Sequence, residues 1–291
     1  MSILYAIIVL GGIGLLGAVV LYMVSKRFYV KEDSRIALIE ELLPGANCGG
    51  CGRSGCHDFA CACVSASSLD SLVCPGAGDE AMNKIASIVG LASVQSRPMV
   101  AVLKCGGSCE VRPSTARYDG AGSCAVMQQL GAGTAGCPCG CLGEGDCVDV
   151  CNWNAIHIDP LSGLPVVDED LCAGCGVCTR ACPRHVLELR PKGPKGRRVW
   201  VACSNTERGA VARKECTAAC IGCMKCEKVC PFGAVTVKDN LSYIDADKCR
   251  LCRKCIVACP TGAILDAGFP ISAKDAAALA DKKQQESKKD D

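Results

Sequence analysis

The chain has 291 residues with a formal net charge of +2, and 28 of its residues are cysteine. With a charge so close to zero, and no lysine and arginine stripe that alternates with aromatic residues, we expect no nucleic-acid partner. A chain of this length can form two or three domains with their own cores, so it does not need disulfides in place of a core. Only 4% of the residues are aromatic, which favours bound metal as a source of stability.

The first expected element is a charge-free stretch of 22 residues, from Ile3 to Val24. That length is enough for a helix to cross the roughly 30 Å hydrocarbon core of a membrane. Basic residues follow the stretch and none precedes it, so the positive-inside rule places the N-terminus outside and the bulk of the chain in the cytoplasm. We therefore expect residues 1–25 to form a single-pass anchor in the cell (inner) membrane.

A glycine-rich segment with four cysteines comes next and predicts a small domain over residues 26–90. The glycines allow the backbone to curl tightly and to aim its N–H groups at sulfur. Four thiolates in one compact segment favour an iron–sulfur cluster, with a zinc ion as the alternative. These cysteines are Cys48, Cys51, Cys56 and Cys74.

Three later segments carry the spacing C-x2-C-x2-C-x3-C followed by proline, which is typical of bacterial two-cluster ferredoxins. In those proteins three thiolates bind one cluster and the fourth binds the neighbouring cluster. A zinc ion has no use for the third and fourth cysteines of this pattern. The complete motifs are Cys172, Cys175, Cys178, Cys182; Cys220, Cys223, Cys226, Cys230; and Cys249, Cys252, Cys255, Cys259.

A fourth motif has the same spacing but carries Glu144 where a cysteine is expected; its cysteines are Cys141, Cys147 and Cys151. Cys137 or Cys139 could supply the missing thiolate, Glu144 could bind through oxygen, or the site could hold a three-iron cluster. The spacing does not choose among these alternatives.

The exchange of the fourth ligand predicts which motifs share clusters. A segment typical of a β-hairpin separates the members of each pair, at Ile156 to Val167 and at Ala234 to Ile244. The predicted sets are Cys172, Cys175, Cys178 with Cys151; Cys141 and Cys147 with Cys182; Cys220, Cys223, Cys226 with Cys259; and Cys249, Cys252, Cys255 with Cys230.

An internal repeat organises the chain beyond residue 98. A strand-like run that ends in cysteine occurs at Val100–Cys105 and again at Val199–Cys203. Each run is followed by Gly-Ala, a further cysteine and a pair of motifs. We therefore expect two tandem ferredoxin-like modules, over residues 98–192 and 196–270, and a disordered tail over residues 271–291.

The predicted fold class is α+β: one transmembrane helix, a small Gly/Cys-rich [4Fe–4S] domain and two tandem modules. The first module has a candidate additional ligand set in Cys105, Cys109, Cys124 and Cys137, whereas the second offers only Cys203 and Cys216. We expect about five or six [4Fe–4S] clusters, of which one could be [3Fe–4S] or atypically ligated. No flavin site, NAD site, acid–base pair or nucleophile stands out, so the chain is expected to relay electrons.

The N-terminal membrane helix, the C-x2-C-x4-C-x17-C domain from Cys48 to Cys74 and the ferredoxin-type motifs together resemble the B subunit of the Rnf complex. The second module, with GAVARKECTAACIGCMKCEKVCPFGAV, resembles the extended form found in anaerobes. The resemblance implies a subunit of an ion-translocating ferredoxin:NAD+ oxidoreductase that pumps Na+ or H+. It also implies soluble ferredoxin as electron donor, and membrane, NADH-binding and flavin-binding subunits as partners. Family relatives provide an alternative, a complex that reduces an iron–sulfur redox sensor.

Overall fold

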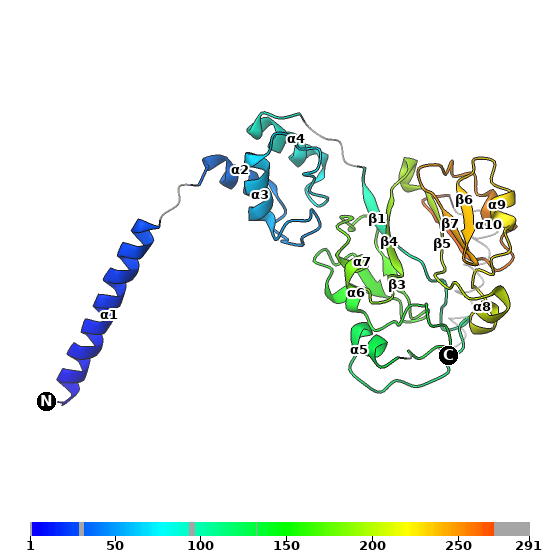
Figure 1. Ribbon diagram of the computed structural model, residues 1–291, viewed down its shortest axis with the longest axis horizontal. Coiled ribbons are helices and arrows are strands. Elements are labelled where there is room, and N and C mark those ends of the chain that lie inside the picture. The colour runs from blue at the N-terminus through cyan, green and yellow to red at the C-terminus, as the bar shows by residue number, and fades with distance from the viewer. Residues whose placement is uncertain (1, 29–31, 93–96, 132, 271–291) are drawn as a thin grey trace, which may run out of the picture.

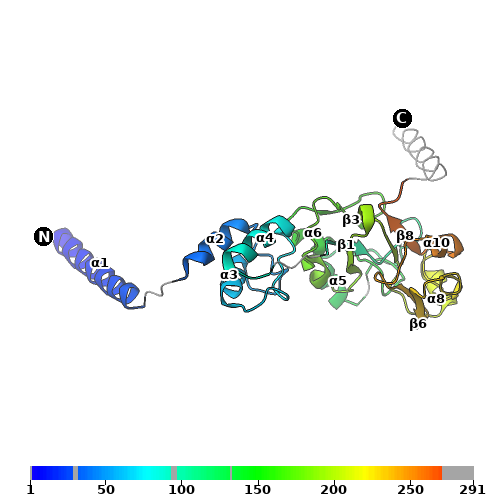
Figure 2. The ribbon, with the colours of Figure 1, turned by 90° about the horizontal axis from the view of Figure 1, so that it is seen from above.

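The computed structural model describes residues 2–28, 32–92, 97–131 and 133–270. The tail expected over residues 271–291 lies outside the described residues. The described elements follow one another along an elongated molecule, with a lone helix at one end, three helices beside it and a strand-containing body beyond (Figures 1 and 2). Mixed helix and strand content confirms the coarse fold class predicted from the sequence.

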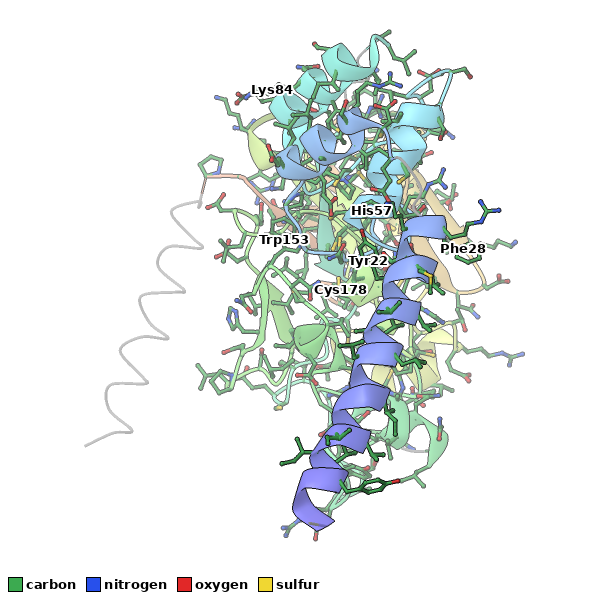
Figure 3. The ribbon with its side chains drawn as sticks, turned by 90° about the vertical axis from the view of Figure 1, so that its left-hand side faces the viewer. Tyr22, Phe28, His57, Lys84, Trp153 and Cys178 are labelled. Carbon is green, nitrogen blue, oxygen red and sulfur yellow. The ribbon has the colours of Figure 1, made fainter. Side chains whose placement is uncertain are left out.

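The lone helix, α1 (Ser2–Arg27), contains the predicted apolar stretch. Its segment Ile7–Arg27 has a mean hydropathy of 2.6 and is long and apolar enough to cross a membrane. Tyr22 and Phe28 are 66% and 75% exposed and extend from its C-terminal end (Figure 3). An apolar helix that packs against no other part of the described chain fits a lipid environment.

Three short helices form the next unit: α2 (Ser34–Leu42), α3 (Cys56–Ser65) and α4 (Gly78–Val89). Asp33 caps α2, because its carboxylate accepts a hydrogen bond from the N–H of Arg35 at 2.9 Å. Ile39, Phe59, Met82 and Ile85 are almost completely buried between the three helices. This unit therefore has a true apolar core as well as cysteines.

The first strand-containing part is built from two antiparallel pairs. Val100 and Val102 are buried in β1, which pairs with β4 so that Ala101 lies opposite Leu189. The predicted hairpin is present as β2 and β3, with Ile156 opposite Val167. Short helices connect the strands. The elements are β1 (Met99–Leu103), α5 (Cys124–Gln129), α6 (Asp146–Asp149), β2 (Ile156–Ile158), β3 (Pro165–Val167), α7 (Val177–Ala181) and β4 (Leu187–Pro191).

The second strand-containing part repeats this arrangement. Here β5 pairs with β8 and β6 pairs with β7, both antiparallel, and the β6–β7 hairpin falls within the predicted Ala234 to Ile244 segment. Its elements are the 3-10 helix η1 (Pro194–Gly196), β5 (Arg198–Val201), α8 (Gly209–Glu215), α9 (Lys225–Lys228), β6 (Val235–Lys238), β7 (Leu241–Ile244), α10 (Lys254–Ala258) and β8 (Ile264–Ala267).

Buried polar contacts hold the two parts together. Arg190 on β4 is only 3% exposed, and its Nη1 donates to the carbonyl oxygens of Ile244 at 2.8 Å and Val199 at 3.3 Å. The indole N–H of Trp200 on β5 donates to the carbonyl oxygen of Leu103 on β1 at 2.9 Å. These bonds fix the relative position of the two parts, and the Trp200 bond joins residues 97 positions apart. They therefore determine which loops beyond the strands lie close together.

Candidate iron–sulfur sites

The glycine-rich loop of the N-terminal unit brings three cysteines, Cys48, Cys51 and Cys56, to the start of α3. Asn47 organises the loop, because its Oδ1 accepts a hydrogen bond from the N–H of Cys56 at 2.7 Å. Gly49 and Gly52 have φ angles of +65° and +79°, a conformation that glycine adopts without strain. Cys74 comes from the segment before α4 and lies close to Cys48 and Cys51. We call this group the Cys48 set: Cys48, Cys51, Cys56 and Cys74.

The Cys48 loop lies directly against the next group of cysteines. A Cβ atom added at Gly50 would be 2.7 Å from the Cβ of Cys175 and 2.8 Å from its carbonyl oxygen. Nearby, the Asn152 amide donates to the carbonyl oxygen of Ala46 at 2.9 Å. The Trp153 ring covers Gly76, and Trp153 and Cys178 lie beneath the three helices in Figure 3. Two candidate sites therefore meet at a close backbone contact.

The cysteine group on the other side of this contact is the one predicted from the first motif pair. Cys178 at the start of α7 is buried and has Cys172, Cys175 and Cys151 as its electrostatic neighbours. The N–H of Ala155 donates to the Sγ of Cys151 at 3.4 Å, the kind of hydrogen bond that tunes iron–sulfur clusters. We call this group the Cys175 set.

A cavity lies where the incomplete motif was predicted, and Cys124 takes part in it. Cys124, Cys141, Cys147 and Cys182 line this space, the Cys141 cavity, which has an empty volume of about 370 Å³. Asp146 positions Cys124 by accepting hydrogen bonds from the N–H groups of Cys124 at 2.7 Å and Ala125 at 2.9 Å.

The residues considered as substitutes for the missing ligand lie elsewhere. The Glu144 carboxylate faces the loop at Gly122, where an added Cβ would be 3.7 Å from its Oε2. Cys137 and Cys139 line a different cavity. Glu144 and Gly145 instead face Cys124 through their backbone N–H groups. The structure thus offers a fourth thiol that the motif spacing did not include.

The second motif pair surrounds two cavities, in the combinations that exchange of the fourth ligand predicts. Their empty volumes are each about 330 Å³. The Cys220 cavity is lined by Cys220, Cys223, Cys226 and Cys259, and the Cys249 cavity by Cys230, Cys249, Cys252 and Cys255. Ser242 contacts the Sγ of Cys226 at 3.3 Å, and Thr261 contacts the Sγ of Cys259 at 3.7 Å.

The additional set considered from the sequence is not brought together. Cys109 is exposed and lies beside the β2–β3 turn, where an added Cβ at Gly163 would be 2.9 Å from its Sγ. Cys124 belongs to the Cys141 cavity. Cys105 and Cys137 instead share a further cavity with Cys139, Cys203 and Cys216, which we call the Cys105 cavity.

The buried thiols fit a metal cofactor. Burial raises the pKa of Cys141, Cys147 and Cys178 to about 12, so without a metal these thiols stay protonated at neutral pH. Iron binding removes those protons because the metal charge stabilises the thiolates. Among the described residues, no group of three or more His, Cys, Asp or Glu side chains could hold a single metal ion. The cysteines instead line shared spaces in sets of four, the number of thiolates that a [4Fe–4S] cluster takes.

Comparison with known proteins agrees with this chemistry. A family model described as a putative Fe–S cluster matches residues 43–69, and one described as a 4Fe–4S dicluster domain matches residues 171–234 and 219–263. The B subunit of a Na+-translocating ferredoxin:NAD+ oxidoreductase complex from Acetobacterium woodii is 40% identical over 250 residues, 86% of this chain and 73% of the relative. The B subunit of an ion-translocating oxidoreductase complex from Methanosarcina acetivorans is 37% identical over 84% of this chain and 90% of the relative. The B subunit of a proton-translocating ferredoxin:NAD+ oxidoreductase complex from Clostridium ljungdahlii is 37% identical over 85% and 86%.

An apolar N-terminal helix, cysteines arranged around cavities and matches to [4Fe–4S] domains define a membrane-associated iron–sulfur protein. The sequence identity of 37–40% to three relatives, over most of this chain and most of each relative, then shows its family. The chain belongs to the family of B subunits of ion-translocating oxidoreductase (Rnf) complexes.

Proposed function

We propose that this chain is the electron-relay subunit of a membrane-bound, ion-translocating ferredoxin:NAD+ oxidoreductase. Family membership supports the class of complex, and the other subunits of that complex are its partners. Soluble ferredoxin is the proposed donor and the membrane subunits are the proposed acceptors. The observation that carries the proposal is the close contact at Gly50, because it places the Cys48 set, next to the membrane anchor, against the Cys175 set.

The arrangement of the cysteines supports five ligand sets. Bound at each set, a [4Fe–4S] cluster supplies reversible one-electron transfer. The chain provides thiolates as ligands, backbone N–H groups directed at sulfur, and burial that excludes water. The proposed sets are the Cys48 set; the Cys175 set of Cys151, Cys172, Cys175 and Cys178; and the cysteines of the Cys141, Cys220 and Cys249 cavities.

The proposed domains follow the same grouping. They are a membrane anchor at residues 1–25, an N-terminal cluster domain at 26–90, and tandem ferredoxin-like modules at 98–192 and 196–270. Lys26 and Arg27 end α1, which supports an N-terminus outside and a cytoplasmic bulk under the positive-inside rule.

Replacing Cys124 should remove one cluster, whereas replacing Glu144 should not. Cys124→Ala takes away a thiol that lines the Cys141 cavity, so we expect a loss of about four iron atoms per chain or conversion to a three-iron site. Glu144→Gln removes only a carboxylate that faces the Gly122 loop. Iron analysis and EPR of the oxidised chain check this. Unchanged iron in Cys124→Ala together with iron loss in Glu144→Gln would contradict the assignment.

The electron-relay proposal is tested by adding reduced ferredoxin to the whole complex, with and without Cys48→Ser. In the unaltered complex, electrons from ferredoxin should reach the membrane subunits. In Cys48→Ser, ferredoxin should still reduce the distal clusters of this chain, but transfer to the membrane subunits should stop. EPR of the chain and NADH formation separate the two steps. Normal NADH formation in Cys48→Ser would rule out the Cys48 set as the exit.

A further inference from the structure

The Cys105 cavity combines cysteines from both strand-containing parts of the chain. Cys105 follows β1 and Cys137 follows α5, whereas Cys203 follows β5 and Cys216 follows α8. All four are buried, at 8%, 6%, 9% and 6% exposure. Together they line a space with an empty volume of about 310 Å³. The Cys220 and Cys249 cavities are likewise each lined by four cysteines, those of the ferredoxin-type motifs.

Three of the four sulfur atoms lie close to Gly107 or Gly140, two glycines whose missing side chains leave space beside the sulfurs. A Cβ added at Gly107 would be 3.5 Å from the Sγ of Cys105 and 3.5 Å from the Sγ of Cys216. A Cβ added at Gly140 would be 3.7 Å from the Sγ of Cys105 and 3.6 Å from the Sγ of Cys137. Cys203 has both Cys220 and Cys105 as electrostatic neighbours, and it lines the same space as Cys105. These thiols therefore surround one space.

Hydrogen-bond donors point at the sulfurs, as they do at the other sites. The N–H of Cys141 donates to the Sγ of Cys105 at 3.4 Å. The amide of Asn205, a side chain only 1% exposed, donates to the Sγ of Cys137 at 3.6 Å. Donors of this kind stabilise thiolates and tune the potential of iron–sulfur clusters.

A buried cation at the same cavity favours an anionic occupant. Arg112 is 9% exposed and lines the cavity, and its Nη1 donates to the carbonyl oxygen of Cys141. Among the described residues, no carboxylate forms an ion pair with it, whereas the buried Arg190 and Arg198 each have one. Because an uncompensated buried charge is costly, a cluster with four thiolates is a suitable counter-charge.

We propose that this cavity holds a further [4Fe–4S] cluster, bound by Cys105, Cys137, Cys203 and Cys216. Assembly takes up iron and sulfide and releases the four thiol protons. Cys139 also lines the cavity, but it is only half-buried and is left without a ligand role.

Such a cluster would lie between the cluster sites of the first strand-containing part and those of the second. Gly140 lines this cavity while the next residue, Cys141, lines the Cys141 cavity. In the same way, Ala219 lines it while Cys220 lines the Cys220 cavity. This role as a connection rests on the proposed relay function, whereas the ligand set rests on the cavity alone.

Native mass spectrometry of the anaerobically purified full chain in detergent tests the proposal. The unaltered chain should carry the clusters of the five sets above and one more. Cys203→Ala/Cys216→Ala should carry one cluster fewer than the unaltered chain, and its reduced EPR signal should integrate to one spin fewer. The matched control Cys109→Ala/Cys139→Ala should keep every cluster.

The outcomes distinguish a failure of the additional cluster site from a failure of the proposed electron-relay function. Five clusters in the unaltered chain would overturn the additional site and leave the relay proposal standing, and so would full cluster content in Cys203→Ala/Cys216→Ala. Loss of a cluster in the control alone would overturn the ligand set. A chain without iron would overturn both proposals. The count on the unaltered chain decides the matter even if the double variant does not fold.

Discussion

Removing iron from the full chain should unfold residues 99–267 while the helices α2, α3 and α4 stay folded. Within residues 97–131 and 133–270, the strands are three to five residues long and form only two-stranded sheets. Isolated pairs of that kind are marginal in water. Cysteines take a substantial part in their buried clusters, as in the group of Ala101, Cys147, Ile156, Cys178 and Leu187, where two of the five residues are cysteines. Loss of the metal should therefore cost on the order of 10 kcal/mol, the scale found for structural metal sites.

Helices α2, α3 and α4 should respond differently to iron removal, because their apolar core does not depend on metal. Ile39, Phe59 and Ile85 are at most 1% exposed and pack together. Hydrogen-exchange mass spectrometry before and after treatment with a chelator and an oxidant measures the difference. We expect protection to disappear in β1, β4, β5 and β8 and to persist in α2 to α4. Full protection of those strands in the iron-free chain would show that the clusters are not structural.

Gly50→Ala should interrupt electron transfer without removing any cluster. The added Cβ would meet the Cβ and the carbonyl oxygen of Cys175 at 2.7 and 2.8 Å, below any normal contact. The Cys48 loop and the Cys175 set must then move apart. Electron transfer slows steeply as the separation of two redox centres grows, so we expect transfer between these two sites to be clearly slower than in the unaltered chain.

Gly122→Ala is the matched control, because its added Cβ would have only the Glu144 carboxylate nearby, at 3.7 Å. Iron content and EPR of both variants should equal those of the unaltered chain. Ferredoxin-driven NADH formation by the whole complex should fall only in Gly50→Ala. Equal rates in the two variants would mean that electrons do not cross the Gly50 contact.

Much of the local structure could be predicted from the sequence because it is encoded locally. The charge-free stretch after Ile3 predicted α1, and the runs between motifs predicted the β2–β3 and β6–β7 hairpins. The two strand-like runs that end in cysteine correspond to β1 and β5. In each case, neighbouring residues carry the pattern.

The grouping of cysteines from distant segments could not be predicted in the same way. Cys124 reaches the Cys141 cavity because Asp146 holds the start of α5 there, a contact that motif spacing does not encode. Two hydrogen bonds bring Cys203 to Cys105 by joining the ends of β5 and β1. The Trp200 indole N–H donates to the carbonyl oxygen of Leu103 at 2.9 Å, and the Gly106 N–H donates to that of Ala202 at 2.8 Å. The cysteines left over from the motifs in both repeats were the available signal, but spacing alone does not join Cys203 and Cys216 to Cys105 and Cys137.

The absorption spectrum of the anaerobically purified chain tests most directly whether these cysteines hold redox-active iron–sulfur clusters. We predict a brown protein with broad visible absorption that bleaches when reduced ferredoxin is added, with iron and sulfide in equal amounts. A colourless chain loaded with zinc would show that the cysteines do not hold iron–sulfur clusters. A brown chain that reduced ferredoxin does not bleach would show that ferredoxin is not the electron donor.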